Sequence, residues 1–311
     1  MIQPLAGRAI VIAGPTASGK SQLAAALGER LGGVIINADS MQVYRELAVL
    51  TARPQPEELA RLPHALYGFV GGQEAYSAGR YGRDAGNAIA AARRAGRVPI
   101  IVGGTGLYLR ALLQGLSPVP SADPAVRAHW RQQAGQRPAR ELHALLGARD
   151  PIMAARLKPT DPQRIVRALE VLDSTGRSLA DWQRQPGQPV LAAGETIPLL
   201  VLPPPASHGA AIAQRFQRML AAGALEEVRR LLALNLAGEL PIMRALGVAA
   251  LADHLAGRQS LAAAAAAVEQ QTRQYAKRQM TWFNRNMISW TKVETKEMER
   301  TTAEILAFIE P

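Results

Sequence analysis

Residues 9–21 read AIVIAGPTASGKS, and this stretch decides the fold. Its first five residues are apolar throughout, which is typical of a strand buried on both faces of a parallel sheet. The next eight match the pattern G-x-x-x-x-G-K-S, and a helical pattern follows over residues 21–31. The sequence therefore predicts a strand, a phosphate-binding loop and a helix, in that order.

The loop pattern has a chemical meaning of its own. Its glycines let backbone N–H groups turn toward an anion, and the helix N-terminus adds the positive end of a dipole. Lys20 supplies a mobile positive charge, and the hydroxyl of Ser21 is a ligand for Mg²⁺, the expected cofactor. The residues predicted to bind polyphosphate are Gly14, Pro15, Thr16, Ala17, Ser18, Gly19, Lys20 and Ser21.

Three further apolar runs, at residues 34–38, 99–102 and 197–202, predict additional strands. Helical patterns separate the strands, including one at 78–95 with Ser77 as a candidate N-cap. Strands that alternate with helices indicate an α/β fold, here a P-loop NTPase-like parallel sheet core with helices on both faces. Ligands bind such sheets beyond the carboxyl ends of the strands.

The prediction for the domains is a core with a helical insertion. Residues 119–195 contain several helical patterns separated by prolines and no strand signal, so they are expected to form the insertion domain. Residues 1–118 and 196–311 then form the P-loop core, with a helical C-terminal part.

Composition excludes several classes of protein. The 311 residues contain no cysteine and five scattered histidines, which excludes disulfides and cysteine nucleophiles and disfavours a histidine-based metal site. Residues 1–7 are too short for a secretory leader, and no apolar run is long enough to span a membrane, so a cytoplasmic protein is expected. We also expect a monomer. The net charge of +11 favours an anionic partner, although genomic composition also produces arginine-rich surfaces.

Asp39 is the one acidic residue at the end of a predicted strand near the loop. A carboxylate there can take a proton from an incoming nucleophile, or it can serve as a helix N-cap or an outer ligand of Mg²⁺. The glycine-rich turn at residues 103–106 contains Thr105, which either hydrogen-bonds a substrate or belongs to a simple tight turn.

Several blocks of the chain together resemble tRNA dimethylallyltransferases, in order and over nearly its whole length. The blocks are 14–21 (GPTASGKS), 39–44 (DSMQVY), 51–54 (TARP), 63–64 (PH), 76–78 (YSA), 102–108 (VGGTGLY), 116–124 (LSPVPSADP), 161–168 (DPQRIVRA) and 272–282 (TRQYAKRQMTW). The resemblance implies transfer of a dimethylallyl group from dimethylallyl diphosphate to the exocyclic amine of the adenosine 3′-adjacent to the anticodon. The implied partners are the tRNA anticodon stem-loop and dimethylallyl diphosphate, and the implied leaving group is diphosphate.

The resemblance also implies roles for individual residues. Asp39, Thr105 and Lys20 match catalytic positions, with Asp39 as the base for the adenine amine. The positions implied to contact tRNA are Asp39, Ser40, Met41, Gln42, Thr105, Arg127, Gln163, Arg164, Ile165, Val166 and Arg167. Taken without the resemblance, Arg164 and Arg167 are also compatible with an ordinary solvated pair on one helix face.

The chain departs from the family pattern at three places. Ala48 stands where relatives commonly carry Asp, Arg53 replaces a Lys, and Gly247-Val248 replaces a Gly-Tyr pair. Three other functions stay open: a small-molecule kinase whose insertion acts as a lid, a GTPase-like RNA binder, and an isopentenyltransferase for free adenine nucleotides. The chain has no guanine-specifying N/T-K-x-D motif, which disfavours the GTPase-like binder. The long insertion and the basic C-terminal part favour tRNA over free nucleotides.

Overall fold

The computed structural model describes residues 7–294 and 298–309. These residues divide into two compact units. The first runs up to Leu113 and resumes at Val190, and the second is Gln114–Pro189.

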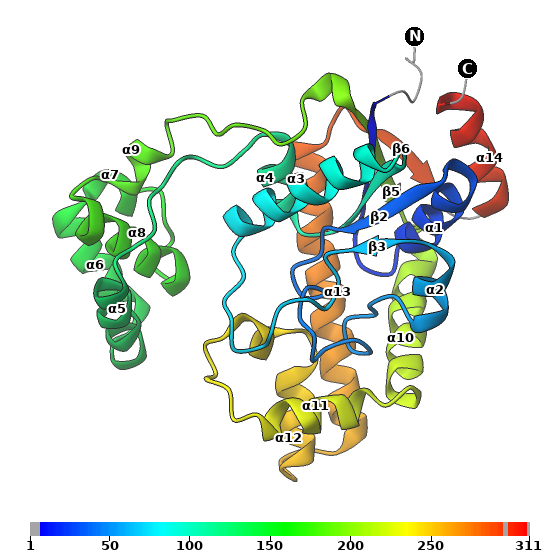
Figure 1. Ribbon diagram of the computed structural model, residues 1–311. Helices are drawn as coiled ribbons and strands as arrows, with labels where there is room; N and C mark the ends of the chain where they lie inside the picture. Colours follow the sequence, from blue (N-terminus) through cyan, green and yellow to red (C-terminus); the bar gives the residue numbers. More distant parts are fainter. Residues whose placement is uncertain (1–6, 295–297, 310–311) are drawn as a thin grey trace. The chain divides into compact units, whose positions relative to one another are not determined.

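A parallel sheet forms the centre of the first unit (Figure 1). Its spatial order is β3-β2-β4-β1-β5-β6, and every neighbouring pair is parallel. The strands are β1 (Ala9–Ala13), β2 (Gly33–Asn37), β3 (His64–Ala65), β4 (Val98–Gly103), β5 (Thr196–Leu202) and β6 (Thr291–Glu294). The four apolar runs correspond to β1, β2, β4 and β5, so the predicted parallel α/β core is confirmed.

The rest of the first unit is mostly helical. Its helices are α1 (Lys20–Leu31), α2 (Pro56–Arg61), α3 (Ala78–Arg94), α4 (Gly106–Leu113), α10 (Pro205–Ala221), α11 (Ala224–Ala233), α12 (Val248–Leu255), α13 (Leu261–Asn286) and α14 (Met298–Ile309), with 3₁₀ turns at Ala193–Glu195 and Pro241–Arg244. The predicted helices at 21–31 and 78–95 are α1 and α3. The Ser77 hydroxyl caps α3 by accepting the backbone N–H of Arg80 at 3.1 Å, as the sequence predicts.

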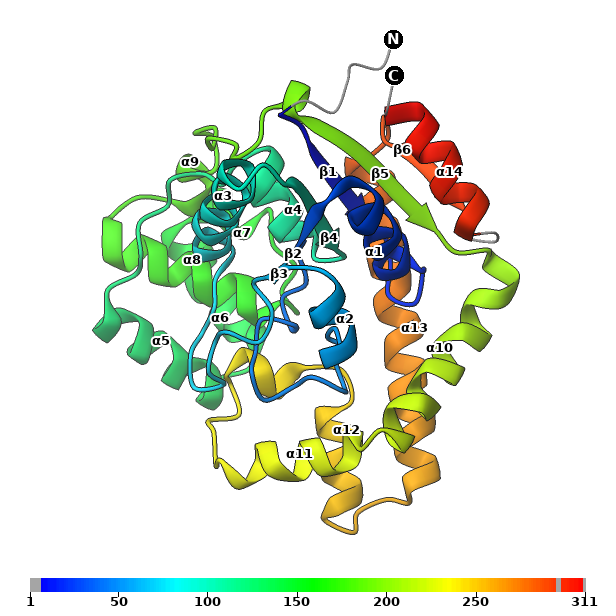
Figure 2. The same ribbon diagram turned by 45° about the vertical axis from the view of Figure 1, so that its right-hand side comes forward.

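Alternation along β1 explains why helices cover both faces of the sheet. Ala9, Val11 and Ala13 pack into one core together with side chains of α3, α4 and α13. Ile10 and Ile12 point to the other face and pack with α1 and α14. Helices α1 and α14 lie side by side in both views (Figures 1 and 2). All five residues of β1 are buried, which is why this strand is apolar throughout.

The two edge strands were not predicted from the sequence. β3 has only two residues, and β6 reads TKVE with only Val293 buried. A search for apolar runs misses such strands, because an edge strand has a neighbour on one side only and keeps polar, exposed side chains.

The second unit is helical. Its helices are α5 (Pro124–Gln136), α6 (Ala139–Arg149), α7 (Pro151–Ala154), α8 (Pro162–Thr175) and α9 (Leu179–Trp182). Residues 114–189 are all described and contain no strand. The unit has its own core, which includes Trp130, Leu142 and Leu169. The insertion predicted at residues 119–195 overlaps this unit.

Asp-Pro pairs start three helices of the second unit. Asp123-Pro124, Asp150-Pro151 and Asp161-Pro162 open α5, α7 and α8. Each carboxylate accepts a backbone N–H from the first turn, at 2.8 to 3.2 Å. Each proline then occupies the first helical position, where no N–H is needed. Three of the prolines that separate the helical patterns in the sequence therefore begin helices.

Among the described residues, no helix is both long and apolar enough to cross a membrane. The expectation about a leader concerned residues 1–7, and all of these except Gly7 lie outside the described residues.

Candidate active site

The phosphate-binding loop lies between β1 and α1. Ala17 and Gly19 have positive φ angles of 58° and 86°, and α1 begins directly after Gly19. A Cβ atom at Gly14 would lie 2.6 Å from the carbonyl oxygen of Val201 on β5, so only glycine fits there. Loops with such left-handed residues turn successive N–H groups into a concave anion site. The backbone therefore has the shape of an anion-binding loop at a helix N-terminus.

Lys20 is the first residue of α1, and its Nζ donates to the carbonyl oxygen of Pro15 at 3.1 Å. Burial, together with the positive charge of Arg215, lowers the pKa of Lys20 to about 8, and the negative charge of Asp39 opposes this shift. A poorly solvated ammonium gains strongly from an anion placed beside it. The position and poor solvation of Lys20 are therefore compatible with the predicted phosphate binding.

Asp39 lies just beyond the carboxyl end of β2 and is held by buried Asn37. The Asn37 Nδ2 donates to the carbonyl oxygens of Asp39 and Leu66 at 2.9 and 3.0 Å, and its Oδ1 accepts the Asp39 N–H at 2.8 Å. The Asp39 Oδ1 accepts the N–H of Met41 at 2.9 Å. This contact closes a local turn, and no α-helix begins there, so the N-cap alternative for Asp39 is not what the structure contains.

Thr105 connects the loop after β4 to the segment that carries Asp39. Its Oγ1 accepts the Ser40 N–H at 3.0 Å and donates to the Ser40 Oγ at 3.3 Å. A Cβ atom at Gly103 would lie 2.2 Å from the backbone of Ala38, so the two loops approach as closely as glycine allows. Thr105 therefore belongs to a tight turn and also fixes the residue after Asp39.

Helix α10 supplies two site residues that sequence reasoning missed. Arg215 Nη1 donates to the Thr16 Oγ1 at 2.8 Å, and His208 Nε2 lies 2.8 Å from the Thr16 carbonyl oxygen. Burial lowers the pKa of Arg215 and Asp39 opposes the shift. No local motif marks either residue. The only signal is their position after the strand β5, which neighbours β1 in the sheet.

A cavity of about 610 Å³ brings these parts together. It is lined by the phosphate-binding loop from Thr16 to Ser21, by Asp39 and Gln42, and by Arg215 and Arg218 of α10. The Gln42 Nε2 donates to the carbonyl oxygens of residues 51 and 52, at 2.9 Å each, which fixes its side chain at the cavity wall. The volume suits a small organic ligand. The site therefore places a carboxylate and a phosphate-binding loop around one space.

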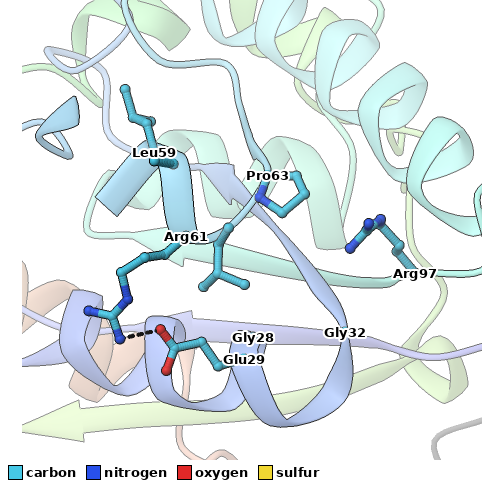
Figure 3. A pocket seen from close by; sticks show the side chains of 9 residues that line it. Gly28, Glu29, Gly32, Leu59, Arg61, Pro63 and Arg97 are labelled. Carbon is cyan, nitrogen blue, oxygen red and sulfur yellow. Dashed lines mark ion pairs between the residues drawn. The ribbon is translucent and has the colours of Figure 1, made fainter. Parts of the chain in front are cut away.

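A second cavity, of about 560 Å³, lies elsewhere on the first unit (Figure 3). Gly32 and Arg97 in its lining directly precede β2 and β4, so it opens at the amino ends of these strands. Arg61 and Glu29 form an ion pair across it (Figure 3). Parallel sheets bind ligands at the opposite end of the strands, which identifies the cavity beside Asp39 as the candidate active site.

The remaining predicted tRNA contacts lie in the second unit. Gln163 and Arg164 are exposed on α8, and Val166 and Arg167 are half-buried on the same helix. Arg164 Nε lies 3.4 Å from Asp161, and Arg167 Nη1 lies 3.5 Å from Glu170. The side chain of Ile165 is fully buried in the core of this unit. Arg127 is half-buried on α5.

The structure shows what the residues at the three departures from the family pattern do. The N–H of Ala48 donates to buried Glu227 at 2.6 Å, and the N–H groups of residues 49 and 50 do the same at 2.9 and 2.8 Å. Arg53 Nη1 donates to the Tyr44 carbonyl oxygen at 3.0 Å, so the arginine supports this loop from inside. Val248 begins α12 and is 1% exposed, so it packs in the core.

Two family profiles match the chain. The family described as IPP transferase matches residues 42–286, and the one described as isopentenyl transferase matches residues 7–66. Among curated proteins, the tRNA dimethylallyltransferase of Parvibaculum lavamentivorans is 49% identical over 310 residues, which cover 100% of this chain and 98% of that protein. The one from Rhodospirillum rubrum is 52% identical over 287 residues, or 91% of this chain and 88% of that protein.

Solved structures show the same likeness. The chain is similar to the tRNA delta(2)-isopentenylpyrophosphate transferase of Staphylococcus epidermidis, with 29% identity and a TM-score of 0.68 over 96% of this chain and 98% of that one. A eukaryotic dimethylallyltransferase acting on tRNA has 27% identity and a TM-score of 0.80, over 96% of this chain and 77% of that one.

Proposed function

The chain belongs to the IPP transferase family, and from that premise we propose that it transfers a dimethylallyl group from dimethylallyl diphosphate to an adenosine of tRNA. It is an enzyme, because its curated relatives are tRNA dimethylallyltransferases, and tRNA is its substrate. In the proposed reaction the acceptor is the exocyclic amine of the adenosine 3′-adjacent to the anticodon, and diphosphate leaves. The observation that supports this most is the single cavity that Asp39 shares with the phosphate-binding loop.

The phosphate-binding loop holds the diphosphate in this proposal. As the bond between the allylic carbon and the diphosphate oxygen breaks, negative charge grows on the leaving group. Lys20, Arg215 and the N–H groups of residues 17–21 are placed to stabilise that charge. The loop thus assists a departing group and transfers no phosphoryl group.

Asp39 takes the proton in the proposed reaction. The adenine amine attacks the allylic carbon, a bond from nitrogen to carbon forms, and one amine proton passes to the carboxylate. Asp39 lines the cavity and its backbone is fixed by Asn37, so its position is defined before substrate binds. Thr105 supports the same segment through Ser40.

Ser21 is the residue proposed to hold Mg²⁺. It is exposed at the start of α1 and lines the same cavity as Lys20. Among the described residues, no group of three or more acidic, histidine or cysteine side chains is arranged to hold a metal ion. Mg²⁺ often takes phosphate oxygens and waters with only one or two protein ligands, so one hydroxyl beside a diphosphate fits. When bound, the ion would neutralise charge on the leaving group.

The tRNA contacts are proposed for both units. The target base must leave its stack to reach the cavity, at a cost of about a few kcal/mol that contacts with the anticodon loop offset. In the first unit Ser40, Met41 and Gln42 adjoin Asp39 and are half-buried. In the second unit we assign contacts to α8 and to Arg127 of α5. We also propose that the enzyme acts as a monomer in the cytoplasm.

A direct test uses unmodified tRNA, Mg²⁺ and dimethylallyl diphosphate, followed by mass spectrometry of nuclease fragments of the tRNA and of its digested nucleosides. The expected result is a dimethylallyl-sized mass gain on adenosine, in the tRNA fragment that carries the anticodon, without ATP. A parallel arm with ATP alone tests the kinase alternative, and an arm with free AMP tests the nucleotide alternative. ATP consumption without any mass gain on tRNA would overturn the proposal.

The pH dependence of donor binding follows from the pKa of Lys20. The free enzyme holds Lys20 at a pKa of about 8, and a bound diphosphate raises that pKa because it stabilises the ammonium. The donor therefore binds the protonated form, so its KM is expected to rise by up to about tenfold per pH unit above 8. Steady-state kinetics from pH 6.5 to 9.5 measure this. A Lys20→Met variant is the control and should show a flat donor KM, whereas an equal slope in both would contradict the assignment.

Removing two arginines of α8 is expected to weaken tRNA binding. Arg164→Gln with Arg167→Gln should lower the affinity and reduce the slope of log K against log salt by about 1.4 units, if each residue contacts one phosphate of a single-stranded loop. Filter binding at several salt concentrations measures the slope. Arg131→Gln with Arg140→Gln removes the same charge from exposed positions of the second unit and should leave the slope unchanged. If both double variants showed the same salt slope, Arg164 and Arg167 would be ordinary surface residues that do not contact tRNA.

A further inference from the structure

Gln279, in the C-terminal half of α13, joins two parts of the site. Its side chain is 6% exposed. The Oε1 accepts the N–H of Thr16 at 2.9 Å, and the Nε2 donates to the carbonyl oxygen of Gly104 at 2.9 Å. One buried amide therefore forms a bridge between the phosphate-binding loop and the loop after β4.

The surrounding contacts make this bridge close and specific. A Cβ atom at Gly104 would lie 2.3 Å from the Gln279 Nε2, so only glycine permits the contact. Tyr275 lies one turn earlier on the same helix face, and a hydrogen bond with Thr105 counteracts the rise in the Tyr275 pKa that burial causes. Trp282 lies one turn later and packs on Gly106. One face of α13 therefore contacts three successive residues of the loop after β4, from Gly104 to Gly106.

The two ends of the bridge belong to different substrates in the proposed reaction. Thr16 lines the cavity on the diphosphate side, and α10 holds its hydroxyl through Arg215. Gly104 precedes Thr105, which fixes Ser40 beside Asp39 on the adenosine side. The amide of Gln279 therefore connects the group that holds the donor to the group that orients the acceptor.

We propose that Gln279 is a positioning residue that sets the placement of the diphosphate-binding loop relative to Asp39. This inference rests on the proposed function. Transfer requires the amine nitrogen about 3 to 3.5 Å from the allylic carbon while the Asp39 carboxylate stays within hydrogen-bond reach of the amine. Without the amide, the Thr16 N–H and the Gly104 carbonyl lose their buried partner, and the two loops shift to find others. A shift of about 1 Å costs on the order of 100-fold in rate.

The test compares Gln279→Glu and Gln279→Leu with the wild type. The glutamate keeps an acceptor for the Thr16 N–H but loses the donor for the Gly104 carbonyl, and the leucine loses both. At saturating donor and tRNA, kcat is expected to fall about 100-fold in both variants, while the Kd for tRNA changes less than about threefold. Gln274→Leu, at an exposed position of the same helix, is the matched control and should retain wild-type kcat. Thermal unfolding of each variant gives the folded fraction, to which kcat is normalised.

Either of two results would overturn this inference and leave the proposed function intact. One is a wild-type kcat in Gln279→Glu after normalisation to folded enzyme. The other is a loss in the Gln279 variants that is confined to tRNA affinity. A merely structural role for Gln279 predicts the first of these, with a lower unfolding temperature as its only effect. A wild-type enzyme that does not transfer the dimethylallyl group would overturn the proposed function, and this inference with it.

Discussion

Replacing Asp39 by asparagine is expected to reduce kcat by about 10²- to 10⁴-fold, while the affinities for dimethylallyl diphosphate and tRNA remain within a few-fold of the wild type. The exocyclic amine of adenine is a weak nucleophile, because its lone pair is delocalised into the ring. Removal of its proton during attack therefore lowers the barrier. Asparagine keeps the Oδ1 that accepts the Met41 N–H, and Asn37 contacts only the backbone at this position, so the local turn is preserved.

Single-turnover measurements on the preformed complex separate this effect from binding. Glu58→Gln is the matched control, because Glu58 lines the same cavity and the change removes the same charge. It is expected to retain turnover within a few-fold of the wild type. If Asp39→Asn lost tRNA affinity but kept its turnover per complex, or if both variants lost turnover equally, Asp39 would not be the base. Asp39→Ala should be at least as slow as Asp39→Asn.

Replacing Lys20 by methionine is expected to lower kcat/KM for dimethylallyl diphosphate by about 10²- to 10³-fold, with tRNA affinity unchanged. Lys20 is the cation of the phosphate-binding loop, and its poor solvation makes its charge effective against a leaving diphosphate. The same poor solvation destabilises the folded enzyme at neutral pH, because the pKa of Lys20 lies below its ordinary value. Lys20→Met is therefore also expected to unfold at the same temperature as the wild type or at a higher one when no donor is present.

The control for Lys20 is Arg218→Met, which removes another cation from the lining of the cavity. Arg218 is exposed on α10, so its loss should reduce kcat/KM by less than about tenfold. Steady-state kinetics with varied donor at saturating tRNA give both values. Equal losses in the two variants would mean that the cavity needs only net positive charge, which would contradict a specific role for Lys20.

Much of the core and part of the site follow from local sequence patterns. The strand at Ala9–Ala13, the loop and the start of α1 occupy consecutive residues, so their order in the chain is also their order in space. Asp39 was found because it follows an apolar run, and the carboxyl ends of parallel strands meet at one edge of a sheet. Helix starts in the insertion are equally local, since the aspartate carboxylate caps the first turn and the proline after it occupies the first helical position.

The sequence by itself therefore determined the α/β core, the phosphate-binding loop and the candidate base, because strand periodicity, glycine conformations and strand ends act over a few residues. Only the tertiary structure decided that His208, Arg215 and Gln279 belong to the site, since they meet Thr16 from 192, 199 and 263 positions away. The sequence alone does not distinguish a polar helix residue that packs against a loop from one that faces water. The tertiary structure distinguishes the two, because it brings α10 and α13 beside the phosphate-binding loop. There Gln279 and His208 reach backbone groups of Thr16, and Arg215 reaches its hydroxyl.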